Sequence, residues 1–215
     1  CPKGLLIQRF IQLRGDGTPT IQGDVTISMD GMPDMKEPVM EGIIVNGKVT
    51  VTQSINNFKL RHCQFGTIQF GAAMPNGLID RCYASYDFMI PPVSENFTVR
   101  NTRICNLTST SLDNNTTLFV NCNIYQIYCE LAAGKFVNCL INRGYDYEKF
   151  ALKNSVLASC GYCYDVFTRD NSTTIEFNCP NRSYNDYGYV VSYYGNSNVD
   201  WIGDDGTKMG SEGGA

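Results

Sequence analysis

Hydrophobic and polar residues alternate in short stretches along this chain of 215 residues. Val25, Ile27 and Met29 are spaced two apart, and Val49 and Val51 continue the pattern. A period of two places alternate side chains on one face of a β-strand, so each stretch predicts a strand with one buried face. Asn, Gly, Ser, Thr and Asp fill the gaps, and Asn and Gly accept the left-handed backbone of sharp bends. Because no stretch has the period of a stable amphipathic helix, we expect an all-β protein.

A degenerate motif recurs along the chain, and its clearest form is Phe-Val-Asn-Cys at 119–122 and again at 136–139. With the cysteine as position zero, the motif has an apolar residue at −3, a polar turn-forming residue at −1, a small residue at zero and an apolar residue at +2. Position zero is occupied by Cys63, Cys82, Thr102, Cys122, Cys139, Ser155 and Cys179, the last in a poorer copy. The copies are therefore about twenty residues apart, a period that marks a repeat architecture.

The length of the repeat selects the architecture. Helical repeats need about 33 to 47 residues and propeller blades about 40 or more, whereas about twenty residues hold three short strands and their turns. The Leu-x-x-Leu-x-Leu spacing of leucine-rich repeats is missing. The sequence therefore predicts a parallel β-helix, a solenoid of about seven or more coils that stack about 4.8 Å apart.

Equal motif positions lie above one another in such a stack, which gives two further expectations. The asparagines at −1 form a ladder in which each side-chain amide bonds the next: Asn101, Asn121, Asn138, Asn154 and Asn178. The apolar and small positions point into the interior: Leu60, Cys63, Phe65, Ile79, Cys82, Val99, Thr102, Ile104, Phe119, Cys122, Ile124, Phe136, Cys139 and Ile141.

On these repeats, the stretch from about residue 40 to 195 resembles the right-handed, single-stranded parallel β-helix proteins of the pectate-lyase-like superfamily. The Gly-rich tail at 202–215 is similar to the segment that closes the solenoid in secreted β-helix proteins of gut-type Bacteroidetes. The resemblance implies three parts: irregular or capping strands at 1–40, the β-helix at 41–195, and a Gly-rich C-terminal segment at 196–215 that continues into a removed region.

Composition narrows the partners and the location. The net charge is −4 with 18% charged residues, and the scattered Lys and Arg predict no nucleic-acid groove. No apolar run is long enough to cross a membrane. We expect a secreted or cell-surface protein, and Cys1 leaves open a processed lipoprotein.

The ten cysteines do not predict a disulfide framework. Five of them occupy motif position zero, where Thr102 and Ser155 also occur, so that position wants a small inward side chain and the motif cysteines should be free thiols. Cys160 and Cys163 form a lone C-x-x-C with no second pair, which is a weak zinc or redox signal. We expect no metal and no cofactor.

Three charged residues share position −2 of consecutive copies: Arg61, Asp80 and Arg100. In a stack they place a carboxylate between two guanidinium groups on an outer strand face, in an exposed pair that contributes about 0 to 1 kcal/mol. They are the weak candidates for catalytic residues, because no second carboxylate lies beside Asp80 as glycoside hydrolysis requires. The single histidine, His62, stands at the turn position −1 and is expected to be a turn residue rather than a general base.

Tyrosine pairs in three successive stretches are the weak candidates for a binding platform: Tyr145, Tyr147, Tyr162, Tyr164, Tyr187 and Tyr189. An outward stripe of these rings would suit stacked sugars. Outward tyrosines would, however, turn neighbouring carboxylates inward without partners, which costs several kcal/mol each, so an interior stack is the favoured arrangement.

Two functions remain open from the sequence. The favoured one is a non-catalytic extracellular β-helix module that presents a face to a polysaccharide, a cell-surface glycan or another surface partner, since no complete catalytic set is found. The alternative is a polysaccharide lyase or glycoside hydrolase of the β-helix type, which rests on the resemblance alone.

Overall fold

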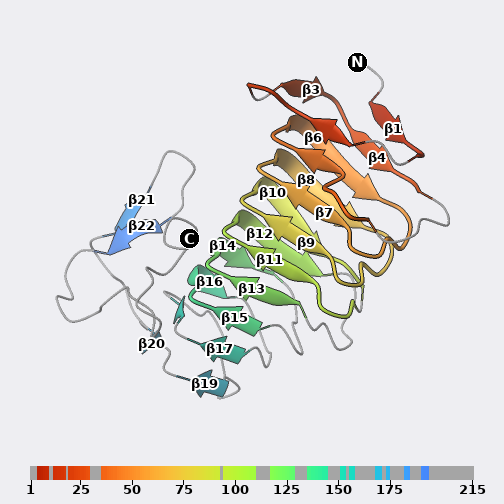
Figure 1. Ribbon diagram of the computed structural model, residues 1–215. Coiled ribbons are helices and arrows are strands. Elements are labelled where there is room, and N and C mark those ends of the chain that lie inside the picture. The colour runs from red at the N-terminus through yellow and green to blue at the C-terminus, as the bar shows by residue number, and fades with distance from the viewer. Residues whose placement is uncertain are drawn as a thin grey trace.

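The structure, a computed structural model, describes residues 4–9, 12–17, 19–29, 35–92, 94–109, 117–128 and 135–144, and the short stretches 151–153, 155–157, 168–170, 173–174, 182–184 and 190–193. Side chains are described within these ranges up to Ile141, and at Ser155. Parallel strands stack in successive rungs and form a β-solenoid of about six turns (Figure 1). The all-β parallel solenoid is therefore confirmed, and the motif copy at Cys179 lies outside the described residues.

Each turn contributes one long and one short strand to two separate sheets. The eleven-stranded sheet contains, in spatial order, β1 (Leu5–Ile7), β4 (Val25–Ile27), β6 (Ile44–Val51), β8 (Gln64–Phe70), β10 (Tyr83–Ile90), β12 (Arg103–Ser109), β14 (Asn123–Ile127), β16 (Leu140–Gly144), β18 (Val156–Leu157) and β20 (Thr173–Thr174), with β3 (Thr20–Gln22) also paired to β6. We call it the long-strand sheet.

The nine-stranded sheet, the short-strand sheet, carries the motif positions −4 to −2. Its order is β19 (Thr168–Asp170), β17 (Ala151–Lys153), β15 (Lys135–Val137), β13 (Leu118–Val120), β11 (Thr98–Arg100), β9 (Leu78–Asp80), β7 (Lys59–Arg61), β5 (Met40–Glu41) and β2 (Leu13–Arg14). A separate antiparallel pair is formed by β21 (Arg182–Tyr184) and β22 (Val190–Tyr193).

The expected register is confirmed in the described part of the chain. Every interior position named above is at most 4% exposed. Phe119 pairs with Phe136 across β13 and β15, and their rings stack 4.8 Å apart at an interplanar angle of 11°. The repeated Phe-Val-Asn-Cys thus places identical rings one above the other inside the solenoid, where stacked aromatic pairs contribute about 0.5–1.5 kcal/mol beyond their buried area.

The corner between the two sheets has a left-handed residue at position −1. His62, Arg81, Asn101, Asn121 and Asn138 have φ between 49° and 54°. The left-handed region costs an L-residue about 1–2 kcal/mol, and Asn is one of the few residues that adopts it routinely. The asparagine at −1 is therefore selected by the backbone, and His62 is a turn residue, as the motif predicts.

The asparagine ladder is present in part. The Asn121 Nδ2 donates to Asn101 Oδ1 at 3.4 Å, and the Asn101 Nδ2 donates to Asp80 Oδ1 at 3.1 Å. The Asn121 Oδ1 accepts no hydrogen bond from the residues that the structure describes. Asn154 and Asn178 lie outside the described residues. The ladder therefore begins on a carboxylate rather than on another amide.

A second left-handed turn, which the motif does not include, precedes the short strands β7, β9 and β11. Asn57, Asn76 and Asn96 have φ between 54° and 57°. The Asn96 Nδ2 donates to Asn76 Oδ1 at 3.0 Å, and the Asn76 Nδ2 donates to Asn56 Oδ1 at 2.9 Å. Two left-handed turns in each of these coils therefore fix where the chain passes from one sheet to the other.

Position zero carries a polar γ-atom as well as a small side chain. The Thr102 hydroxyl donates to the Arg100 carbonyl at 2.7 Å and accepts from the Cys82 N–H at 3.3 Å. The Cys82 thiol donates in the same way to the Asp80 carbonyl at 3.4 Å, and its sulfur accepts from the backbone of Cys63. Each γ-atom therefore links its own turn to the turn below.

These hydrogen bonds at position zero also explain why the motif cysteines are free thiols. Cys63, Cys82, Cys122 and Cys139 are free and buried, which confirms the prediction for these four, and Cys179 lies outside the described residues. The pKa values of the Cys82 and Cys122 thiols lie well above the usual thiol value, and burial is the main cause. The protonated thiol is the form that can donate to a carbonyl, so the buried environment preserves the link.

Replacing Arg81 by Asn should stabilise the protein. Arg81 has φ 53°, and Asn would adopt that conformation with less strain. The free energy of unfolding should rise by about 0.5–1 kcal/mol, less than the full strain because a favourable charge near Asp80 is lost. Arg81→Lys is the control, because it keeps both the charge and the strain. Urea unfolding curves in which Arg81→Asn is no more stable than Arg81→Lys would contradict this account.

Candidate functional site

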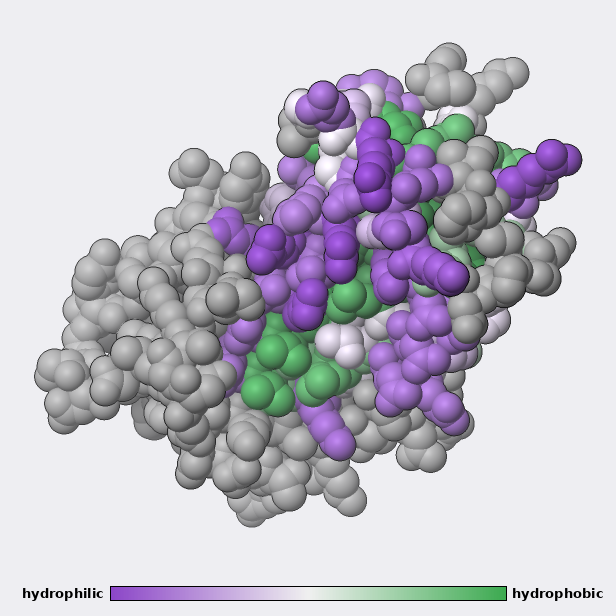
Figure 2. Space-filling model, in the orientation of Figure 1, coloured by the Kyte–Doolittle hydropathy of each residue, from purple (hydrophilic) through white to green (hydrophobic). Residues whose placement is uncertain are grey.

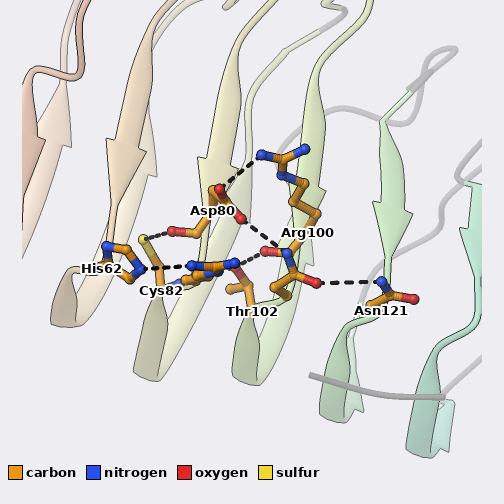
Figure 3. Close-up of polar contacts among 8 residues, drawn as sticks. His62, Asp80, Cys82, Arg100, Thr102 and Asn121 are labelled. Atoms are coloured by element: carbon orange, nitrogen blue, oxygen red, sulfur yellow. Dashed lines mark hydrogen bonds and ion pairs between the residues drawn. The ribbon is translucent and has the colours of Figure 1, made fainter. Parts of the chain in front are cut away.

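The structure brings together Asp80 and Arg100 of the three candidate charged residues. Both lie on the short-strand sheet, where Asp80 pairs in register with Arg61 on one side and Arg100 on the other. The Arg100 Nη2 donates to Asp80 Oδ2 at 3.0 Å, and the other carboxylate oxygen accepts from Asn101 (Figure 3). Asp80 thus lies between the two arginines in register and within reach of Arg100, as expected, and no hydrogen bond or ion pair among the described residues joins it to Arg61.

The expectation that both members of the Asp80–Arg100 ion pair are exposed is wrong. The Asp80 side chain is 9% exposed, whereas that of Arg100 is 45% exposed. Burial acts to raise the Asp80 pKa, but the hydrogen bonds from Arg100 and Asn101 and the charges of Arg100 and Arg81 outweigh it, and the pKa lies below its usual value. Asp80 is thus an ionised acceptor whose two oxygens both hold donors, and this arrangement suits a structural role.

His62 contributes to the same corner without joining an acid. Its Nε2 lies 3.5 Å from the Arg81 Nη1 (Figure 3). Its backbone N–H donates to the Asp80 carbonyl at 3.0 Å. The neighbour of the imidazole is therefore a cation, which is the opposite of the carboxylate that orients a catalytic histidine.

A hollow lies farther along the same face, toward the C-terminal turns. It has a volume of about 420 Å³ and is lined by Glu95, Asn96, Thr98, Leu118 and Lys135. Glu95 and Asn96 come from the second asparagine turn, and the other three stand at the first position of β11, β13 and β15. The Glu95 and Lys135 side chains form no hydrogen bond or ion pair with any residue that the structure describes. Within the described residues, neither charge therefore has a partner.

An apolar surface adjoins the hollow. Figure 2 shows a hydrophobic patch between polar regions near β13 and β15. The outward residues Leu118, Val120 and Val137 of these strands are half-buried and apolar. Motif position −2 is thus charged at Arg61, Asp80 and Arg100 and apolar at Val120 and Val137, as the motif copies indicate.

One exposed aromatic side chain lies on the other sheet. Tyr86 of β10 is 67% exposed, and it stands at a bulge where Ser85 and Tyr86 face the single residue Cys105 of β12. Next to it, the Asn106 Nδ2 donates to Asp87 Oδ1 at 3.1 Å. The motif does not predict this residue, because the extra position is a departure from the repeat. The signal in the sequence is the longer spacing between the inward residues Ala84 and Phe88 than between Phe65 and Ile68.

The remaining candidates receive no structural support here. All six tyrosines proposed as a platform, from Tyr145 to Tyr189, lie outside the residues whose side chains are described. Within the described ranges, no cluster of three or more His, Cys, Asp or Glu side chains could hold a metal ion. Those ranges also contain no helix of the length and apolarity that a membrane span needs.

Comparison with known proteins gives no relative from which a function could be transferred. No protein family, curated protein or solved structure matches this chain. The functional argument therefore rests on the surface chemistry described above.

Replacing Asp80 by Ala should destabilise the protein, because it leaves two donors without their acceptor. The expected loss in the free energy of unfolding at pH 7 is about 1–3 kcal/mol. Glu37→Ala is the matched control, since Glu37 pairs with Arg14 at 3.4 Å in an exposed bridge and should cost about 0–1 kcal/mol. Equal losses for the two variants in chemical unfolding would show that Asp80 is no more than a surface charge.

The contribution of Asp80 should also depend on pH. A carboxyl group whose pKa is lowered by folding stabilises the folded state above its unfolded pKa, and this stabilisation is lost as the pH falls through the folded pKa. The difference in stability between the wild type and Asp80→Asn should therefore be full at pH 7 and shrink below about pH 4. A difference that stays constant down to pH 2 would contradict the ionised arrangement.

Proposed function

We propose that this chain is a non-catalytic, extracellular β-solenoid module that holds a glycan or another surface partner on the outer face of its short-strand sheet. The observation that carries the proposal is the hollow of about 420 Å³ beside the apolar patch. Its lining combines an apolar floor at Leu118 with a carboxylate, an amide, a hydroxyl and an ammonium group. Binding sites for small molecules commonly have this combination of apolar surface and a few convergent polar groups.

We favour binding over catalysis because the Asp80 carboxylate already accepts two hydrogen bonds within the protein. Both oxygens of this carboxylate hold donors, and His62 faces an arginine. A carboxylate that serves as a general acid or base must exchange a proton with the substrate, and either oxygen of Asp80 would weaken its bond to Arg100 or to Asn101 in doing so. Glu95 and Lys135, which have no partner among the described residues, are instead available for hydrogen bonds to the hydroxyl groups of a bound sugar.

The proposal includes a family and a location. We place the chain among the right-handed β-helix proteins of the pectate-lyase-like kind, close to the secreted β-helix proteins of gut-type Bacteroidetes. Its support is the twenty-residue motif and the Gly-rich tail at 202–215. A secreted or cell-surface location follows from that placement.

A glycan array combined with an assay for new reducing ends tests the function. The wild type should bind at least one polysaccharide and release no reducing ends from it. Lys135→Ala and Glu95→Ala should each weaken binding about tenfold, the loss of one charge-assisted hydrogen bond. Lys59→Ala is the matched control, because Lys59 occupies the same strand position as Lys135 outside the hollow and contacts a backbone carbonyl.

Product formation would overturn the proposal. If the wild type cleaved a polysaccharide and Asp80→Asn abolished cleavage while the protein stayed folded, the chain would be a lyase or hydrolase centred on Asp80 and Arg100. Failure to bind any glycan on the array would remove the glycan part of the proposal.

A further inference from the structure

The bend of the long-strand sheet has a surface that differs from the rest of the solenoid. In β8 the bend consists of two adjacent residues that are not buried, Gly66 and Thr67, between the buried Phe65 and Ile68, whereas β6 and β10 have three such residues at the same place. The stacked turns therefore form an outer edge along the axis. The edge carries glycine in two turns and then, in β10, the bulge with Tyr86.

The two glycines leave bare backbone beside the tyrosine ring. A Cβ atom on Gly66 would lie 2.8 Å from the Gly47 carbonyl oxygen, and one on Gly47 would lie 2.6 Å from the Gly23 carbonyl oxygen. Real Cβ atoms do not approach that closely, so the stacking of the turns requires glycine here. The same hypothetical Cβ on Gly66 would lie 3.4 Å from Tyr86 Cδ2, which places the ring edge over the glycine.

The bulge determines that Tyr86 is exposed. A β-bulge adds a residue to one strand and re-aims its side chain, and bulges occur often at functional sites. Because β10 has one more residue between its inward positions than β8 or β12, Tyr86 has no residue opposite it in register in either neighbouring strand. A ring of this size with 67% exposure has a large apolar area in water.

The polar side chains beside the ring hold each other in place and still have oxygen atoms that can accept hydrogen bonds. Asp87 and Asn106 are held to each other by the 3.1 Å bond from Nδ2 to Oδ1. Asp87 Oδ2 and Asn106 Oδ1 hold no hydrogen bond with the residues that the structure describes, and no cation there forms an ion pair with Asp87. The next turn places Gln126 in register with Asn106; it is 5% exposed, and its side chain makes no hydrogen bond within the described part.

We infer that Tyr86, Asp87 and Asn106 form a binding ledge for a neutral saccharide, separate from the hollow on the short-strand sheet. One sugar ring would stack its apolar face on Tyr86. Its hydroxyl groups would donate to Asp87 Oδ2 and to the side-chain oxygen Oδ1 of Asn106. The charge of Asp87 excludes an acidic sugar, because a second carboxylate would meet it without an intervening cation.

The inference rests on the proposed function only for the class of ligand, since the ledge and the hollow share no residue. Affinity electrophoresis of the whole chain in gels containing dextran, mannan, xylan or soluble starch, with polygalacturonate as the acidic probe, tests it. At least one neutral polymer should retard the wild type. Tyr86→Ala should reduce the retardation at least tenfold in apparent affinity, and Tyr86→Phe should retain it because the ring remains.

Tyr128→Ala is the matched control, because Tyr128 is 53% exposed and follows β14 outside the ledge. It should leave the retardation unchanged, and circular dichroism should show the same fold for all variants. Retardation that is lost with Lys135→Ala but not with Tyr86→Ala would overturn the ledge and leave the proposed function standing. Retardation by polygalacturonate alone would overturn the ledge as well, and no retardation by any polymer would overturn both.

Discussion

The hydrogen-bonded corner at motif positions −1 and zero is the constraint on which the solenoid depends. From β7 to β15 the chain leaves the short-strand sheet through a left-handed residue at −1. The N–H at position zero then bonds a γ-atom instead of a carbonyl of either sheet, as at Cys82 and Cys139. A buried N–H that finds no acceptor costs about 1–3 kcal/mol. The γ-atom of the next turn supplies the acceptor, as Thr102 does for Cys82 and Ser155 does for Cys139 at 3.1 Å. This is why Cys, Thr and Ser are exchangeable there: each is small, and each carries a donor and an acceptor.

This constraint separates structural chemistry from chemistry that is available to a ligand. The thiols, the asparagine at −1 and the Asp80 carboxylate all have partners within the corner, so the residues that look most reactive in the sequence are committed to the fold. The groups that remain free lie away from the corner. Glu95 and Lys135 belong to a hollow on one sheet, and Tyr86 and Asp87 belong to the bend of the other. A module that binds through its outer faces is consistent with that distribution.

The sequence predicts what repeats and misses what departs from the repeat. The interior positions, the free thiols and the turn role of His62 follow from one register, because equal positions must stack. The burial of Asp80 was not predictable, since it depends on Asn101 reaching down one turn as well as on Arg100. The turn at Asn57, Asn76 and Asn96 could have been found, because each lies six residues before position zero. Tyr86 could not be assigned from the motif, because β10 has one residue more than the neighbouring β8 and β12, and β6, which also has an extra residue relative to β8, carries no aromatic side chain there.

The corner account is tested most directly at Thr102, whose hydroxyl both donates and accepts within hydrogen-bond distance. Thr102→Val keeps the shape and removes the hydroxyl, whereas Thr102→Ser keeps the hydroxyl and removes a methyl group. The measurement is the free energy of unfolding of both variants in urea, with the denaturant slope checked for each. The account predicts that Thr102→Val loses about 1–3 kcal/mol and that Thr102→Ser loses clearly less. A valine variant as stable as the serine variant would contradict it, because the corner would then require a small side chain and nothing more.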